Sequence, residues 1–165
     1  MENSEVVHQV RQCLELLSVK SGLKAVDYGR QAGGWTGYIG DRYLTALDVE
    51  KALVGLPVHA YLAIKVQILA NDPHDGWAAM RDLACFVDYH LGSDGSKFGR
   101  ACLEYWVVYW ARADGSAMDA FCRFGGSRSA QQRYWAKIKD LLDSWFVIAK
   151  GQLEVLLCPE VLEVA

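Results

Sequence analysis

A long apolar run is absent from this chain of 165 residues, although 52% of its residues are hydrophobic. The most apolar stretch, 62–70, is interrupted by Lys65 and Gln67, whereas a membrane-spanning helix needs about 18 or more apolar residues in a row. The first residues, Met1 to Glu5, are acidic and lack the basic start and apolar core of a secretory signal. We therefore expect a folded, cytoplasmic protein with no membrane partner.

Cysteine occurs without any of the spacings that bind metal. The five cysteines are odd in number and far apart, with no Cys-x-x-Cys pair and no histidine close to two of them. This pattern argues against a zinc site or a disulfide framework and indicates mostly buried thiols in a reducing compartment. We expect no metal and no cofactor. The cysteines are Cys13, Cys85, Cys102, Cys122 and Cys158.

Groups suited to catalysis are also scarce. The segment 71–75 places Asp72 and Asp75 beside His74, but these residues are adjacent at an expected helix start, where aspartate acts as a cap. The glycines of 33–37 have neither the preceding strand nor the Lys-Ser/Thr pair of a phosphate-binding loop. We therefore expect no enzymatic activity and no small-molecule substrate.

Helical spacing of apolar residues runs through most of the chain and predicts an all-α fold with about seven helices. The expected organisation is a helical body over 1–113, a helix-turn-helix over 114–150 and a tail over 151–165. The segment 96–113 is apolar nearly all round and should be the central helix, with its aromatic residues in the core. The other helices of the body are expected over 5–17, 42–55, 57–70 and 73–91.

One segment interrupts the helical pattern. Residues 29–40 contain five glycines in twelve positions and are predicted to be a loop, because glycine disfavours the interiors of helices and strands. The pattern leaves open whether this is an ordinary long loop or one that carries function.

The segment 116–146 is predicted to be a helix-turn-helix that places a long basic helix against DNA. Ser116 can cap a short helix, and Gly125-Gly126 break the backbone, with Gly125 able to take the left-handed C-cap conformation. Ser127 can cap the longer helix that follows. The inward stripe of the longer helix should be Tyr134, Ile138, Leu141, Leu142, Trp145 and Ile148.

Basic residues gather on this segment. The net charge of the chain is −3, yet residues 120–139 hold five cations and no acid. Arginine pairs with guanine and glutamine with adenine, whereas cations further along a recognition helix reach phosphates. The alternative is a helical hairpin with a solvated basic face. The candidate DNA-binding residues are Arg123, Ser127, Arg128, Ser129, Gln131, Gln132, Arg133, Trp135, Lys137 and Lys139, with Arg133 and the two lysines assigned to phosphates.

Residues 116–142 resemble region 4 of bacterial sigma factors, which has the same order of short helix, Phe-Gly, Ser/Thr-Arg and a lysine-bearing helix that ends in leucines. The resemblance covers about a sixth of the chain. Two positions depart from it, since Phe121 stands where the unit has a small residue and Gln131 where it has an apolar one. Either the two helices pack further apart, or Gln131 turns outward to read bases.

A small regulator with such an element near its end resembles the phage Q-protein antitermination factors, in their zinc-free branch, and the AlpA-type antiterminators of bacterial lysis programmes. That resemblance implies binding to double-stranded DNA near a promoter and loading onto RNA polymerase paused with its sigma factor. It also implies that the RNA exit channel is narrowed, so that terminator hairpins cannot form. The glycine-rich segment would then contact polymerase or the RNA opening through Arg30, Trp35, Tyr38 and Arg42.

Two other functions remain open on the sequence. A conventional helix-turn-helix activator or repressor would bind its site and change initiation only. A phage-encoded inhibitor of a host factor would show neither a DNA footprint nor a salt-dependent affinity for DNA.

Overall fold

The computed structural model describes residues 36–39, 42–45 and 51–157. The chain forms two compact units, one of Val58–Val147 and one of Met1–Pro57 with Ile148–Ala165. Helices make up most of the described residues, so the predicted all-α class is confirmed, with six α-helical segments in this part of the chain. The helix predicted over 5–17 lies outside the described residues.

The unit that includes Met1–Pro57 contains a β-hairpin. β1 (Thr36–Ile39) and β2 (Arg42–Thr45) pair antiparallel, with Ile39 opposite Arg42. The loop predicted over 29–40 is therefore wrong at 36–39, and the helix predicted over 42–55 is wrong at 42–45, although 51–54 are helical. The missed signal was Gly40-Asp41 between two short apolar runs, since such a pair is typical of two-residue hairpin turns.

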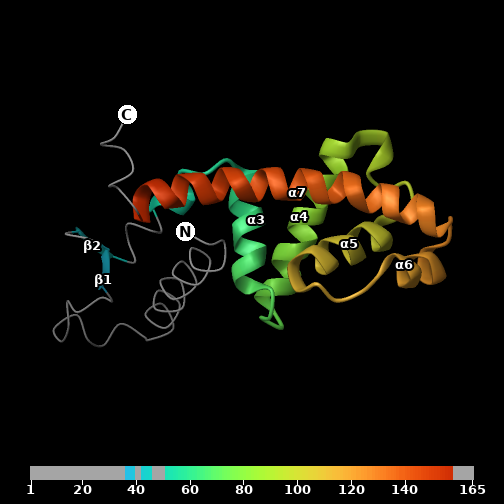
Figure 1. The fold of residues 1–165 in the computed structure, drawn as a ribbon, viewed down its shortest axis with the longest axis horizontal. Coiled ribbons are helices and arrows are strands. Elements are labelled where there is room, and N and C mark those ends of the chain that lie inside the picture. Colours follow the sequence, from blue (N-terminus) through green and yellow to red (C-terminus); the bar gives the residue numbers. More distant parts are fainter. Residues whose placement is uncertain (1–35, 40–41, 46–50, 158–165) are drawn as a thin grey trace. The chain divides into compact units, whose positions relative to one another are not determined.

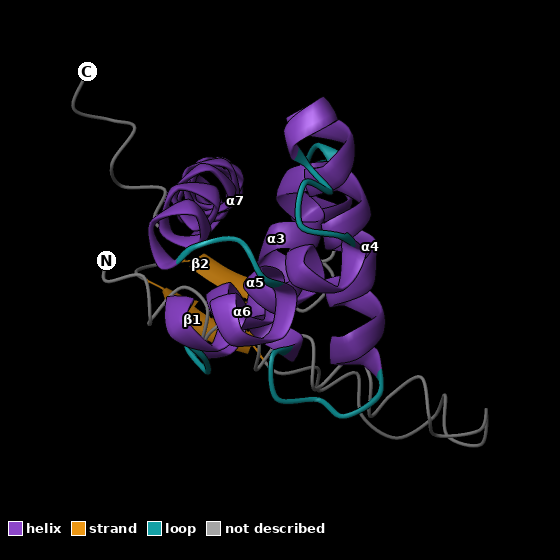
Figure 2. Cartoon of the chain, turned by 90° about the vertical axis from the view of Figure 1, so that its right-hand side faces the viewer, coloured by secondary structure: helices purple, strands orange, loops and turns teal. Residues whose placement is uncertain are grey.

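The unit Val58–Val147 consists of packed helices (Figure 1). The elements are α3 (Val58–Leu69), α4 (Asp75–Leu91), the 3-10 turn η1 (Gly92–Asp94), α5 (Arg100–Arg112), α6 (Ala117–Phe124) and α7 (Arg128–Leu157), of which residues up to Val147 belong to this unit. Neighbours in the chain pack in turn, α3 on α4, α4 on α5 and α5 on α6 (Figure 2). Leu103, Trp106 and Val107 of α5 are fully buried, which confirms the predicted central helix.

The starts of two helices test the predicted boundaries. Asp72 Oδ1 accepts hydrogen bonds from the backbone N–H groups of His74 (2.8 Å) and Asp75 (2.6 Å) at the start of α4. These bonds lower the pKa of the Asp72 carboxyl, and they confirm that the carboxylate acts as a cap. α5 begins at Arg100 rather than at 96, because residues 92–99 form η1 and a turn in which the Gly99 N–H bonds to the Ser96 carbonyl at 2.8 Å.

The inner face of α7 follows the predicted stripe over most of its length. Its buried members are Tyr134, Ile138, Leu142 and Trp145, and Leu141 is half-buried. The assignment of Ile148 is wrong, because its side chain is 41% exposed while Ala149 is buried. α7 also continues through Gly151 to Leu157, where a tail is predicted. One interior glycine costs a helix only about 1 kcal/mol and need not end it.

The cysteines in the described part of the chain differ in their surroundings. Cys102 is buried, whereas Cys85 and Cys122 are exposed, so the prediction of mostly buried thiols is wrong for these two. The Cys85 Sγ accepts a hydrogen bond from the Arg100 guanidinium at 2.9 Å.

Candidate nucleic-acid interface

α6 is the first helix of the predicted helix-turn-helix, and its start is held on α5. Ser116 Oγ accepts the Asp119 N–H at 3.1 Å, which confirms the predicted cap. The hydroxyl of Tyr105 accepts the Ser116 N–H at 2.7 Å and donates to the Ser116 carbonyl at 2.9 Å. Helical spacing does not reveal this second contact, because Tyr105 belongs to the preceding helix.

The turn between α6 and α7 lies where the two glycines predict it, but Gly125, with φ +79° and ψ −158°, does not adopt the left-handed C-cap conformation. Gly125 and Gly126 have φ angles of +79° and +83°, and the Gly125 N–H bonds to the Phe121 carbonyl at 2.9 Å. Ser127 Oγ then accepts the Ala130 N–H at 3.1 Å and caps α7. The turn also packs closely on Phe98, since a Cβ at position 126 would lie 2.7 Å from the Phe98 ring.

Phe121, which departs from the sigma-type pattern, is turned away from the core. Ala120 is the fully buried residue of α6 and belongs to the core cluster, while Phe121 is 38% exposed. The buried position of α6 is therefore the one before the position at which that pattern has its small residue.

Gln131 lies inside the protein, which corrects its assignment to DNA. Its side chain is fully buried, and its Oε1 accepts hydrogen bonds from Trp106 Nε1 at 3.1 Å and Cys102 Sγ at 3.5 Å. Its Nε2 donates to the Gly125 carbonyl at 3.0 Å. The side-chain amide thus links the turn to α5. Buried polar groups need such partners, and α5 and the turn together supply them.

Trp135 is also turned toward the core. It is half-buried and stacks on Trp106 with ring centroids 5.1 Å apart and planes 16° apart. Its edge meets the Tyr109 ring, at a centroid distance of 5.0 Å and an angle of 71°. A base contact from Trp135 is therefore not supported, because both of its aromatic neighbours belong to α5.

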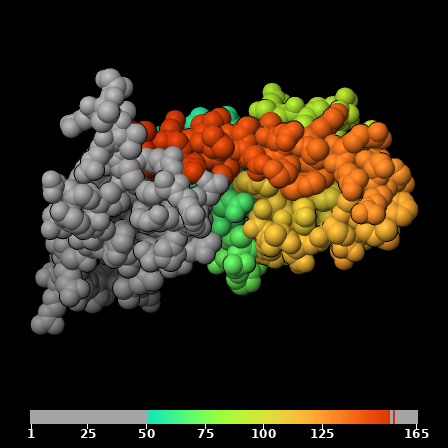
Figure 3. Space-filling view, in the orientation of Figure 1, coloured from blue at the N-terminus to red at the C-terminus, as the bar shows by residue number. Residues whose placement is uncertain are grey.

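The opposite side of α7 carries the accessible candidates. Arg123 and Ser127, which precede α7, are exposed as well, and the Arg123 guanidinium lies 5.8 Å from the Tyr105 ring centroid. Figure 3 shows α6 and the first turns of α7 as a continuous orange surface. We call the exposed residues of the first three turns of α7 the outer face: Arg128, Ser129, Gln132, Arg133, Ala136 and Lys137.

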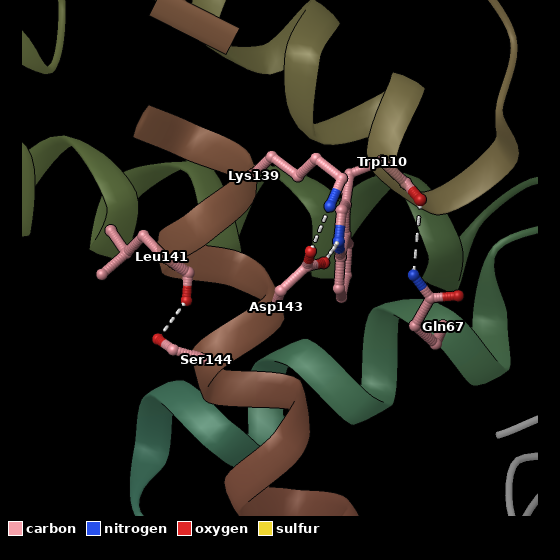
Figure 4. Close-up of polar contacts among 6 residues, drawn as sticks. All are labelled: Gln67, Trp110, Lys139, Leu141, Asp143 and Ser144. Atoms are coloured by element: carbon pink, nitrogen blue, oxygen red, sulfur yellow. Dashed lines mark hydrogen bonds and ion pairs between the residues drawn. The ribbon is translucent and has the colours of Figure 1, made fainter. Parts of the chain in front are cut away.

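The two lysines predicted to bind phosphates lie at opposite edges of α7, and each contacts an acid. Lys137 Nζ is 2.6 Å from Asp94 Oδ2 of η1. Lys139 Nζ is 2.5 Å from Asp143 Oδ2, and the other oxygen of Asp143 accepts the Trp110 Nε1–H at 2.9 Å (Figure 4). Asp143 raises the pKa of Lys139 through this contact. The run of cations that the sequence shows is therefore partly neutralised, at Lys137 by an acid from another element and at Lys139 by an acid one turn further along α7.

The candidate polymerase contacts fall elsewhere. Tyr38 lies on β1, opposite Tyr43, and Arg42 begins β2. Arg30 and Trp35 lie outside the described residues.

Among the residues that the structure describes, no three His, Cys, Asp or Glu side chains are grouped so that they could hold a metal ion. Within that part of the chain, no helix combines the length and apolarity needed to cross a membrane. Comparison with protein-family models, with curated proteins and with solved structures found no match to this chain.

Proposed function

We propose that the outer face of α7 binds double-stranded DNA and that the protein regulates transcription. The observation that carries this proposal is the separation of roles along the first turns of α7. Gln131 and Trp135 fasten the helix to α5, while Arg128, Gln132 and Arg133 stay in solvent at the start of a capped helix. A rigid helix that presents hydrogen-bonding side chains from its N-terminal turns is suited to the major groove.

The chemistry of the outer face fits base reading. Arg128 and Gln132 are four residues apart, which places them about 6 Å apart along the helix axis and on one side of it. Arginine can donate two hydrogen bonds to guanine, and glutamine can donate to and accept from adenine. Ala136 continues this row with a small side chain, which allows the helix backbone to come close to a groove.

The finer form of the proposal is antitermination of the Q or AlpA type. It rests on the resemblance of residues 116–142 to sigma region 4, in which the cap, the glycine turn and the arginine after it are shared. On this proposal the protein binds near a promoter, loads onto polymerase paused with sigma factor and prevents hairpin formation at the RNA exit channel. A conventional activator or repressor is the second candidate, because the outer face requires no polymerase contact.

Selection from a pool of random duplexes by the full-length chain tests DNA reading. One sequence is expected to be enriched, and Arg128→Ala is expected to reduce the preference for it over random duplex by about 1–3 kcal/mol. Arg81→Ala is the matched control, since Arg81 is an exposed arginine on α4. Equal binding of all duplexes, or equal effects of the two substitutions, would contradict the proposal.

Transcription in vitro tests the finer form. The template carries the enriched sequence near its promoter and an intrinsic terminator downstream, and the reaction contains polymerase with sigma factor. Increased read-through supports antitermination, whereas altered initiation with unchanged read-through supports the conventional regulator. Inhibition that needs no DNA site points to a factor that acts on a host protein.

A further inference from the structure

A hollow of about 130 Å³ opens between the segment 94–98 and the first turns of α7. At about 30 Å³ per water molecule, this volume holds roughly four waters, or a phosphate group with part of its hydration. Three of its lining residues are cations and one is an acid, which gives the wall a net charge of +2. The lining residues are Asp94, Lys97, Phe98, Ala130, Arg133, Tyr134 and Lys137.

The segment that supplies Lys97 is fixed against the helix-turn-helix. The Tyr134 hydroxyl donates to the Gly95 carbonyl, and burial raises the pKa of Tyr134, which keeps that proton in place. The Phe98 ring lies 5.3 Å from the Tyr134 ring and fits against Gly126 of the turn. Lys97 therefore follows a tethered segment, and its ammonium lies 5.8 Å from the Phe98 ring centroid.

Asp94 is the one acidic residue among those that line the hollow, and it forms an ion pair with Lys137. The two groups are 2.6 Å apart, and their side chains are 44% and 56% exposed. Lys137 lowers the pKa of the Asp94 carboxyl, so this group is charged at neutral pH. Exposed ion pairs are weak. A phosphate group, with more acceptor oxygens than a carboxylate, can therefore replace Asp94 beside Lys137.

We propose that this hollow binds a phosphate group through Lys97, Arg133 and Lys137, and that Asp94 competes with the phosphate for Lys137. The group can belong to a nucleic-acid backbone or to a free phosphorylated molecule. In the first case the site rests on the proposed function, because Arg133 and Lys137 belong to both the hollow and the outer face. Phosphate contacts beside base contacts set the register of a protein on a duplex.

Titration of the full-length chain with inorganic phosphate, at constant ionic strength, tests the site without DNA. Saturable shifts of the amide resonances of 94–98 are expected. Lys97→Ala should weaken binding about tenfold, as expected for loss of a charge-assisted hydrogen bond, and Asp94→Asn should strengthen it about threefold. Arg81→Ala and Asp82→Asn change the charge equally on exposed positions of α4 and serve as controls. Thermal unfolding of each variant verifies that it is folded.

The same variants, titrated with a random-sequence duplex, identify the source of the phosphate. If the backbone is the ligand, Lys97→Ala lowers the slope of log affinity against log salt by about 1. If inorganic phosphate binds but Lys97→Ala leaves the affinity for the duplex unchanged, the ligand is a free phosphorylated molecule. Phosphate binding with no duplex binding at all leaves the site intact and contradicts the proposed function. The site is overturned if Lys97→Ala and Asp94→Asn affect both probes no more than the controls do.

Discussion

Gln131 and Gln132 are adjacent in sequence and identical in chemistry, yet they lie on opposite sides of α7. Gln131 is fully buried and bonds to Trp106, Cys102 and Gly125, whereas Gln132 is exposed on the outer face. One glutamine holds the helix on α5, and the other is free to meet a ligand surface.

This difference shows that residue type alone is a poor guide to a reading face. Gln131 is three residues before Tyr134 and seven before Ile138, so helical spacing places it on the buried stripe. Its polarity suggested an outward position. The inward position is stable because the Trp106 indole of α5 lies within hydrogen-bond distance of the Gln131 side-chain oxygen.

The largest effect on stability is expected from removing the buried side-chain amide of Gln131. Gln131→Leu keeps most of the volume but leaves the buried Trp106 N–H without its acceptor, and should lower the free energy of unfolding by about 2–3 kcal/mol. Urea unfolding followed by tryptophan fluorescence measures this. Gln132→Leu is the matched control and should change stability by less than about 0.5 kcal/mol. Similar losses for the two variants would break the comparison.

Removing the exposed side-chain amide of Gln132 should instead affect DNA binding and leave stability unchanged. Gln132→Ala is expected to leave unfolding unchanged and to reduce the preference for the selected duplex by about 1–3 kcal/mol, because a bidentate base contact is lost. Competition binding against random duplex gives this value. A change in stability without a change in preference would assign Gln132 to the fold instead of the interface.

The packing of the turn between α6 and α7, which contains Gly125 and Gly126, can be tested by substitution of Gly126. Both have positive φ, but only at position 126 would a Cβ strike the Phe98 ring. Gly126→Ala should therefore destabilise the protein by about 1–2 kcal/mol more in the presence of Phe98 than in a Phe98→Ala background, where the backbone strain is the same but the ring is absent. Equal losses of stability in the two backgrounds, measured by thermal unfolding, would show that Phe98 does not press on the turn.

The smallest expected effect is a dependence of stability on pH, and it arises near Trp145 on the buried side of α7. Trp145 is met there by His59 of α3 and His90 of α4, at centroid distances of 5.2 and 4.9 Å. Burial lowers the pKa of His59, and the nearby His90 lowers it further. The unfolded chain then takes up a proton at His59 more readily than the folded chain.

Stability from His59 is therefore fully present above about pH 6.5, the unfolded value, and is lost as pH falls toward the lower folded value. Urea midpoints at pH 7.5, 6.0 and 5.0 measure this slope, which His59→Gln should flatten. His74→Gln, at an exposed position, is the control. The region around Gln131 contributes no such slope, because an amide does not titrate in this range.

The sequence by itself determined the features that depend on neighbours within about four residues. These are the all-α class, the Ser116 and Ser127 caps, the glycine turn and most of the buried stripe of α7. Only the tertiary structure decided that α5 supplies the hydrogen-bond donors for the buried Gln131 amide and the ring on which Trp135 stacks. The tertiary structure also decided that Asp94 and Lys97 meet the first turns of α7. The physical reason is that these contacts join segments more than twenty residues apart, whose alignment depends on how whole helices pack. The outer face contains fewer residues than the basic segment of the sequence suggested. The helix that carries it is held on α5 by Gln131 and Trp135.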